Sequence, residues 1–324
     1  MHGFSQNNGT IMNEHPAVEA TGLVKTFGDL LVVDNLNLTL REGEMFALVG
    51  PDGAGKTTTI RMLCGILLPT SGRARVCGYD VVSELGEVKK RIGYLSQKFS
   101  LYGDLTVDEN IEFFGEIHRV DHYQERRDEL LEFTRLTPFR HRLAERLSGG
   151  MKQKLALACT LIHSPKILFL DEPTTGVDPV SRREFWKILH SLLNQKLTIL
   201  ITTPYLDEAE RCSRVALMHR GKLLDVDVPA HLRRHMKSDV MEIVCEPVRV
   251  AFEALRGRKE FEEVQAFGDR LNVVLKEPVG NTAVVEKMLR TAGVSVTHIR
   301  MITPSLENVF ISLLTRSDRD EVYS

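Results

Sequence analysis

Unbroken apolar runs alternate along the chain with segments in which apolar residues recur every three or four positions. Residues 45–49, 166–172 and 197–202 are mostly apolar, which is typical of strands buried on both faces of a parallel sheet. Helical spacing separates and follows these runs, at 58–68, 149–163 and 182–194. Strands that alternate with crossover helices predict a three-layer α/β domain.

Two other regions lie beside this predicted core. Residues 17–25 alternate well enough to form an edge strand, and residues 30–40 continue as one or two more strands. From about 101 to 143 the pattern is mostly helical, and Thr106 with Glu109 forms the capping box that opens a helix. We therefore expect a helical insert between two stretches of α/β character.

The pattern changes again near Val228. The next strands and helices are predicted in the order β-α-β-β-α-β, at 240–245, 248–255, 263–267, 271–275, 282–292 and 294–301. This order is that of a small α+β domain of the ferredoxin-like type. A last helix is expected after it, with Thr303 as its cap and Pro304 at its first position. The polar residues 1–16 are expected to be a flexible tail.

Composition places the chain among soluble globular proteins. It has 324 residues, of which 43% are hydrophobic and 27% charged, and its formal net charge is −2. That charge gives no basic surplus, so no nucleic-acid partner is expected. No apolar segment is long enough to cross a bilayer, which predicts a cytoplasmic protein or one held at a membrane by a partner. The five cysteines lack metal or redox spacing, and the pairs His118/His122 and His231/His235 lack a third ligand.

The strongest chemical motif is Gly50-Pro51-Asp52-Gly53-Ala54-Gly55-Lys56-Thr57-Thr58, which fits the phosphate-loop pattern G-x-x-x-x-G-K-[ST]. It lies between a predicted strand and a predicted helix, the context that the motif requires. The glycines allow backbone N–H groups to surround phosphate oxygens at a helix N-terminus. Lys56 supplies a positive charge for the outer phosphates, and the hydroxyl of Thr57 is placed to bind Mg²⁺.

Two further stretches carry chemistry. Ser148 is a good N-cap, and Gly149 and Gly150 leave backbone amides uncovered, so this segment is either an ordinary helix start or a second anion site. Asp171 and Glu172 end an apolar strand, where ligands collect in parallel sheets. An aspartate in that position can hold Mg²⁺, and the following glutamate can polarise an attacking water.

The phosphate loop, Leu147-Ser148-Gly149-Gly150 and Leu170-Asp171-Glu172 stand in one order that resembles the ATPase subunit of an ABC transporter. The resemblance covers about 17–228 and implies a phosphate-loop NTPase cassette with a RecA-like core, an antiparallel β subdomain and a helical subdomain at about 98–146. Residues 205–210 and 304–310 resemble the drug-resistance-type exporter branch, which often carries a small C-terminal domain, here 229–324.

The resemblance assigns roles to matching residues. Phe27, which by itself would be expected to pack under a turn, matches the position that stacks on adenine. Gly50, Gly53, Gly55, Lys56, Thr57 and Thr58 match the phosphate-loop contacts with ATP. Gln97 matches a glutamine that senses Mg²⁺ and the attacking water, while Asp171 matches the metal ligand and Glu172 the catalytic base. Ser148, Gly149 and Gly150 would bind ATP held by an opposing subunit, and Asp178 would lie in the loop that crosses the dimer interface.

One position departs from the family pattern. The strand after the acidic pair is expected to end in a histidine that contacts the γ-phosphate, and Pro204 stands there instead. Proline offers no donor, so that contact is lost and slow hydrolysis is expected. The alternative is that Glu172 alone suffices and turnover is merely slower. A homodimer would lack the histidine in both sites, so a second, different ATPase subunit is favoured over a second copy.

The implied function is to energise an exporter of a drug, lipid or other hydrophobic substrate through a separate membrane subunit. The cofactors would be ATP and Mg²⁺, the helical insert would dock on the membrane subunit, and the chain would lie peripherally on the inner face of the membrane. Two alternatives remain: a weakly hydrolysing or regulatory cassette, suggested by Pro204, and a soluble ABC-type protein acting on nucleic acid or ribosomes. The latter usually has two cassettes, a coiled-coil insert or basic tails.

Overall fold

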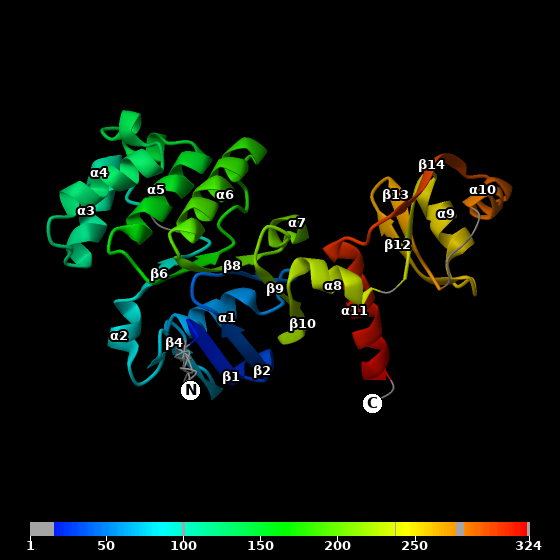
Figure 1. Ribbon diagram of the computed structural model, residues 1–324, viewed down its shortest axis with the longest axis horizontal. Coiled ribbons are helices and arrows are strands. Elements are labelled where there is room, and N and C mark those ends of the chain that lie inside the picture. The colour runs from blue at the N-terminus through cyan, green and yellow to red at the C-terminus, as the bar shows by residue number, and fades with distance from the viewer. Residues whose placement is uncertain (1–15, 99–100, 237, 277–281, 323–324) are drawn as a thin grey trace, which may run out of the picture. The chain divides into compact units, whose positions relative to one another are not determined.

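The computed structural model describes residues 16–98, 101–236, 238–276 and 282–322, so all but the last residue of the predicted tail lies outside the described part (Figure 1). The chain divides into two compact units, which are considered separately. The first contains residues up to 46 together with 52–203 and 220–222. The second contains 47–51, 204–219 and the chain from 223 onward.

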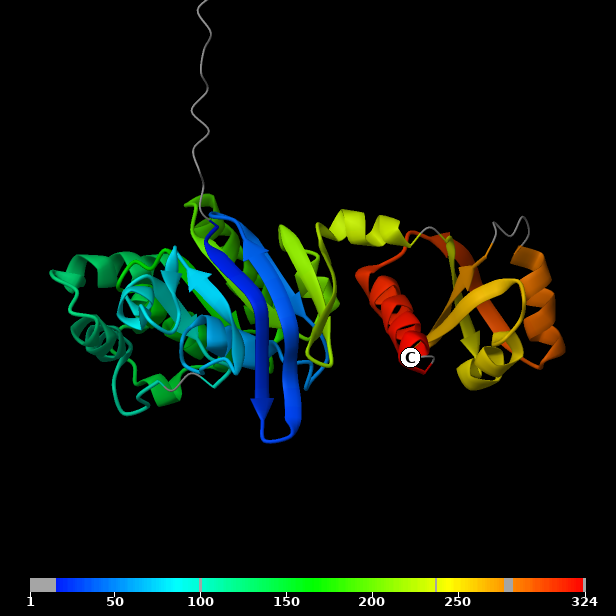
Figure 2. The same cartoon turned by 90° about the horizontal axis from the view of Figure 1, so that it is seen from below.

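An antiparallel sheet of four strands in the order β2-β1-β4-β5 belongs to the first unit. Its strands are β1 (Val18–Phe27), β2 (Leu30–Leu40), β4 (Ser71–Val76) and β5 (Tyr79–Asp80). Figure 2 shows β1 and β2 as a long twisted hairpin. The strand β4 pairs with β1 from Ser71 onward. Gly72 makes this pairing possible, because a Cβ there would lie 2.1 Å from the carbonyl oxygen of Gly22.

Parallel strands lie at the apolar runs 166–172 and 197–202, as predicted, and one more strand pairs beside them. β6 (Ile92–Leu95), β7 (Ile167–Asp171) and β8 (Thr198–Thr203) pair in parallel. The whole sheet has the order β10-β9-β3-β8-β7-β6, with β3 (Met45–Val49), β9 (Arg214–His219) and β10 (Lys222–Asp227). Every residue of β3, β7 and β8 is buried, which explains their unbroken apolar character. The strand β10, whose residues are mostly half-buried, was not predicted.

The predicted helices of the first unit are present, although the one expected at 58–68 spans only Lys56–Leu63. The helices are α1 (Lys56–Leu63), α3 (Val107–Ile117), α4 (Tyr123–Phe133), α5 (Gly149–Leu161), α6 (Pro179–Asn194) and a short α2 (Leu85–Lys89) that was not predicted. The capping box of α3 is confirmed, because the Glu109 amide donates to the Thr106 hydroxyl and the Thr106 amide donates to the Glu109 carboxylate. Within the described ranges no helix combines the length and apolar character that a bilayer crossing requires.

The C-terminal part of the second unit has the predicted ferredoxin-like arrangement. Its strands β11 (Val240–Glu246), β12 (Phe261–Phe267), β13 (Arg270–Leu275) and β14 (Ser295–Ile302) pair antiparallel in the order β12-β13-β11-β14. The helices α9 (Val248–Leu255) and α10 (Thr282–Thr291) cover one face, and a buried apolar core lies between helices and sheet.

The last helix, α11 (Leu306–Val322), packs against α7 (Leu206–Ala209) and α8 (Pro229–His235) within the second unit. The predicted cap at Thr303 is wrong, because Ser305 takes that role. The Asn308 amide donates to the Ser305 hydroxyl at 3.3 Å, and the Ser305 amide donates to the Asn308 side chain at 3.0 Å. Asn308 lies three positions after Ser305, so it supplies the reciprocal bond that Thr303 has no partner to make.

Candidate functional site

The phosphate-loop motif forms a tight turn between β3 and α1. Gly53 has φ +79° and Gly55 has φ +103°, backbone conformations that residues with a Cβ rarely adopt. Gly55 is the N-cap of α1, and no side chain caps this helix. A Cβ on Gly53 would meet no atom within 4 Å, so the loop is open at that point. Gly50 follows β3 directly and Thr58 lies in the first turn of α1, so the loop joins the buried strand to an uncapped helix N-terminus that favours anions.

Three oxygen-bearing side chains meet where β7 and β8 end. The hydroxyls of Thr57 and Thr202 both donate to Oδ1 of Asp171, at 2.9 and 2.7 Å. Asp171 is fully buried, and its second oxygen, Oδ2, has no hydrogen-bond partner in the described part of the chain. A buried carboxylate oxygen without a partner is costly, and oxygen ligands are those that Mg²⁺ prefers. The residues present therefore fit a magnesium ion held by Thr57 and Asp171.

Glu172 connects this strand end to the phosphate loop. Its Oε1 lies 3.1 Å from Nζ of Lys56, and the side-chain amide of Gln97 donates to its Oε2 at 3.1 Å. The side chains of Lys56 and Glu172 are only 3% and 8% exposed, so this ion pair is weakly screened by solvent. Glu172 also has φ +48°, a strained conformation for a residue with a side chain. Five of the predicted residues thus belong to one cluster: Lys56, Thr57, Gln97, Asp171 and Glu172.

Thr202, to which no motif in the sequence gives a role, lies at the centre of this cluster. Besides donating to Asp171, its hydroxyl accepts the backbone amide of Glu172 at 3.0 Å, so it holds both carboxylate residues. The sequence does show a threonine inside an apolar strand, and that strand pairs in parallel with the strand that carries Asp171. This was the only sign that Thr202 belongs to the site. Pro204 is the single residue between the end of β8 and Tyr205, the N-cap of α7.

The signature segment and Asp178 each begin a helix. Ser148 is the N-cap of α5, where its hydroxyl accepts the amide of Met151 at 3.3 Å. Gly149 is exposed with no atom near its Cβ position, whereas Gly150 is buried. Asp178 is the N-cap of α6, and the amides of Val180 and Ser181 donate to its carboxylate at 3.0 Å. These bonds, led by that from Ser181, lower the pKa of Asp178 below its ordinary value.

The ring of Phe27 is not packed away. It ends β1 and is 48% exposed, with Nζ of Lys25 lying 4.9 Å from the ring centroid. An exposed ring is available to stack on a planar base, as the resemblance predicts, whereas a ring packed under the turn would be buried.

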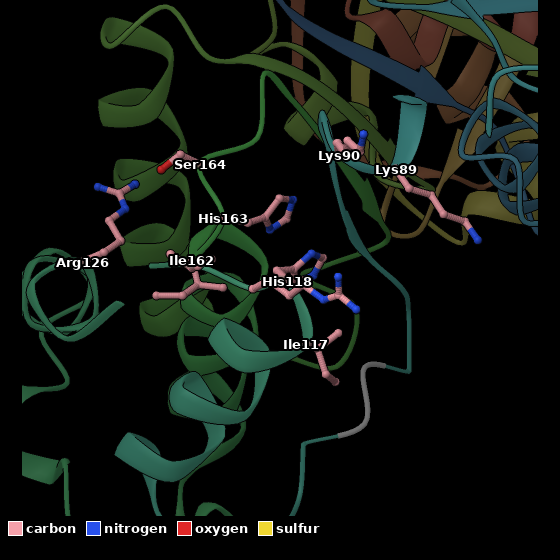
Figure 3. Close-up of a pocket in the computed structure, with 10 residues that line it drawn as sticks. Lys89, Lys90, Ile117, His118, Arg126, Ile162, His163 and Ser164 are labelled. Carbon is pink, nitrogen blue, oxygen red and sulfur yellow. The ribbon is translucent and has the colours of Figure 1, made fainter. Parts of the chain in front are cut away.

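The largest cavity described here, of about 640 Å³, lies beside the helical insert (Figure 3). His118 and His163 stack in it with ring centroids 3.9 Å apart, so His118 pairs with His163 rather than remaining a free surface histidine. Burial lowers the pKa of His118, and burial together with His118 lowers the pKa of His163 to about 4. Ser164 and four basic side chains complete the polar lining, the basic ones being Lys89, Lys90, Arg119 and Arg126.

Two family models match the chain. One, described as "ABC transporter", matches residues 33–175, and the other, described as "ATP-binding protein DrrA1-3-like, C-terminal domain", matches residues 229–314.

Two curated relatives extend this similarity. The chain is 45% identical over 224 residues to the probable multidrug ABC transporter ATP-binding protein YbhF of Escherichia coli, which covers 68% of this chain but only 39% of YbhF. The chain therefore spans well under half the length of that relative. It is 34% identical to the Nod factor export ATP-binding protein I of Ralstonia nicotianae, over 98% of this chain and 99% of that protein.

Solved structures resemble the cassette portion. The ATP binding subunit of an ABC transporter superimposes with a TM-score of 0.62 at 26% identity, over 68% of this chain and 93% of that one. The dimeric structure of MJ0796, a bacterial ABC transporter cassette, gives a TM-score of 0.58 at 25% identity, over 65% of this chain and 98% of that one. These similarities confirm the predicted phosphate-loop cassette fold.

Proposed function

The chain belongs to the family of ABC transporter ATP-binding proteins, and from that membership we propose that it binds and hydrolyses Mg-ATP to energise an exporter through a separate membrane subunit. The observation that carries the proposal is the buried cluster in which Lys56 and Gln97 both contact Glu172 beside Asp171. We propose the domain limits 17–228 for the cassette and 229–324 for the accessory domain.

Each residue of the cluster has a distinct part in this proposal. Asp171 and Thr57 would hold the magnesium ion, which when bound offsets the negative charge of the phosphates. Lys56 would bind the outer phosphate oxygens, as the helix N-terminus beside it favours anions. Glu172 would accept a proton from the attacking water, and Gln97, already bonded to its Oε2, would orient that carboxylate. Phe27 would stack on the adenine ring.

The assembly we propose is a dimer in which two ATP sites are shared. Ser148, Gly149 and Asp178 are exposed at helix starts, where a second subunit can reach them, and Gly150 lies buried beside them. The similarity to a dimeric cassette supports this arrangement. Because Pro204 removes a donor from one site, a heterodimer is favoured: the partner's site would be complete and would use the signature of this chain.

The membrane partner is proposed to dock at the cavity beside the helical insert (Figure 3). Lys90 pairs with Glu87 and Arg126 pairs with Glu129, whereas Lys89 and Arg119 have no ion pair within the described residues. Lys89 and Arg119 make the cavity basic, and it also presents the 58% exposed side chain of Ile117. An acidic segment of the partner with one apolar side chain fits this lining.

Pull-down of the tagged chain from detergent-solubilised membranes tests the proposed partnership. An integral membrane protein recovered with a second ATPase subunit supports the exporter. Recovery of ribosomal RNA without a membrane protein would favour a soluble ABC-type protein acting on ribosomes instead.

The substrate class and the accessory domain complete the proposal. Export of a drug, lipid or other hydrophobic molecule is supported by relatives named for multidrug transport and Nod factor export. For the accessory domain we propose dimer stabilisation or regulation. Its last helix, α11, packs against α7, which begins two residues after Pro204. The proposed location is the inner face of the cell membrane, through the membrane partner.

A further inference from the structure

We propose that Gln153 fastens the signature helix α5 to the segment that carries Glu172, so that the two shared ATP sites of a dimer respond to each other. This inference rests on the proposed function, because it needs one site served by Glu172 and another served by the signature. Gln153 has a positioning role in it and need not touch ATP.

The first link joins α5 to the residue after the catalytic carboxylate. The side-chain amide of Gln153 donates to the carbonyl oxygen of Pro173 at 2.7 Å. On the other side of Glu172, its backbone amide donates to Thr202. Hydrogen bonds therefore fix the backbone on both sides of Glu172, whose φ is strained. The bond from Gln153 lies at the residue directly after Glu172.

Two more links lie on the same face of α5. Gly150 packs directly against α6, because a Cβ at this position would lie 2.3 Å from the Cβ of Ser181. Lys154, which is 9% exposed, pairs with Glu184 one turn further along α6. Gly150, Gln153 and Lys154 are spaced three and four residues apart, so they share one face of the helix.

The three links make α5, the segment after Glu172 and the first turns of α6 one connected block, in which Figure 1 shows α5 and α6 side by side. Asp178 caps α6 at the amide of Ser181, so it is attached to the same block. A shift of Glu172 on binding ATP in this chain would be transmitted to Ser148 and Gly149. Those residues would contact the ATP held by the other subunit. Binding of ATP at one site would in this way affect the other site.

The experiment compares the full-length chain with two variants. Gln153→Glu keeps the size of the side chain but removes its donor, and Gln153→Lys keeps a donor of similar reach. Below the concentration at which the chain dimerises, hydrogen exchange of residues 149–155 is measured with and without Mg-ATP. Affinity for Mg-ATP is measured at the same concentration, and kcat at saturating ATP is measured above it, where the shared sites form.

We expect Mg-ATP to slow exchange at the start of α5 in the unaltered chain, and Gln153→Glu to lose this response. Its kcat should fall by about threefold to tenfold, the effect of one hydrogen bond, while affinity stays within about twofold. Gln153→Lys should restore both values. Equal exchange responses and equal kcat in Gln153→Glu and the unaltered chain would overturn the coupling. Failure of the unaltered chain to bind Mg-ATP would instead overturn the proposed function beneath it.

Discussion

Replacing Pro204 by histidine is expected to raise the rate of ATP hydrolysis. Thr202, two residues earlier in the chain, bonds to both Asp171 and Glu172, so the end of β8 borders the reacting groups. Pro204 is the first residue after β8, so a side chain there lies close along the chain to this end of the strand. An imidazole there would supply the donor that proline lacks.

The visible gain in rate depends on the added donor and on whether the variant stays folded. One preorganised donor aimed at developing charge contributes about 3 kcal/mol to the transition state, on the order of a hundredfold in kcat. Removal of the proline ring costs about 0.4–1 kcal/mol of folding stability, through the freedom gained by the unfolded chain. A domain with an ordinary stability of about 5–15 kcal/mol remains folded after that loss, so the gain in rate should be visible.

The assay is steady-state phosphate release at saturating Mg-ATP, with Pro204→Ala as the matched control. Alanine removes the ring as histidine does but adds no donor, so its rate should equal that of the unaltered chain. A rate for Pro204→His no higher than that of Pro204→Ala would refute the reasoning. Slow turnover would then have to originate in the buried cluster itself, and the preference for a heterodimer would lose its basis.

Two further predictions concern stability. Gly150→Ala should lower the free energy of unfolding by about 1–3 kcal/mol, because the new methyl group meets Ser181. Gly149→Ala should change that free energy by less than about 1 kcal/mol, and denaturant titration of both variants checks the difference. His163 has a pKa of about 4 in the fold, lowered from 6.5 by burial and by His118, so the unfolded chain binds more protons between these pH values. The free energy of unfolding should therefore fall as pH decreases from about 6.5 to about 4. The fall should be steeper than in His163→Gln by up to about 1.4 kcal/mol per pH unit. A free energy that rises as pH decreases over this range would contradict the lowered pKa of His163.

The sequence predicted those parts of the fold in which local pattern and burial agree. β3, β7 and β8 are buried at every residue, so their apolar runs were sufficient. The four strands and two helices of the C-terminal domain likewise lie in the predicted order. The strand β10 is half-buried and pairs at a sheet edge, where no side-chain pattern identifies it.

The candidate site divides in a similar way. Glycines with positive φ and a lysine at a helix start are required by the loop itself, so the motif located them in advance. The bonds of Thr202 and Gln153 depend on which strands and helices become neighbours. Their partners Asp171 and Pro173 are 31 and 20 residues away, and no local spacing encodes such contacts.

The most direct test of the central claim is hydrolysis of Mg-ATP by the full-length chain and by Glu172→Gln. That variant keeps the size of the side chain and a group that can accept from Gln97, but it cannot take a proton from water. The account predicts slow, magnesium-dependent hydrolysis by the unaltered chain, and none by Glu172→Gln, which should still bind Mg-ATP. Equal rates for the two proteins would contradict the claim that Glu172 is the catalytic base.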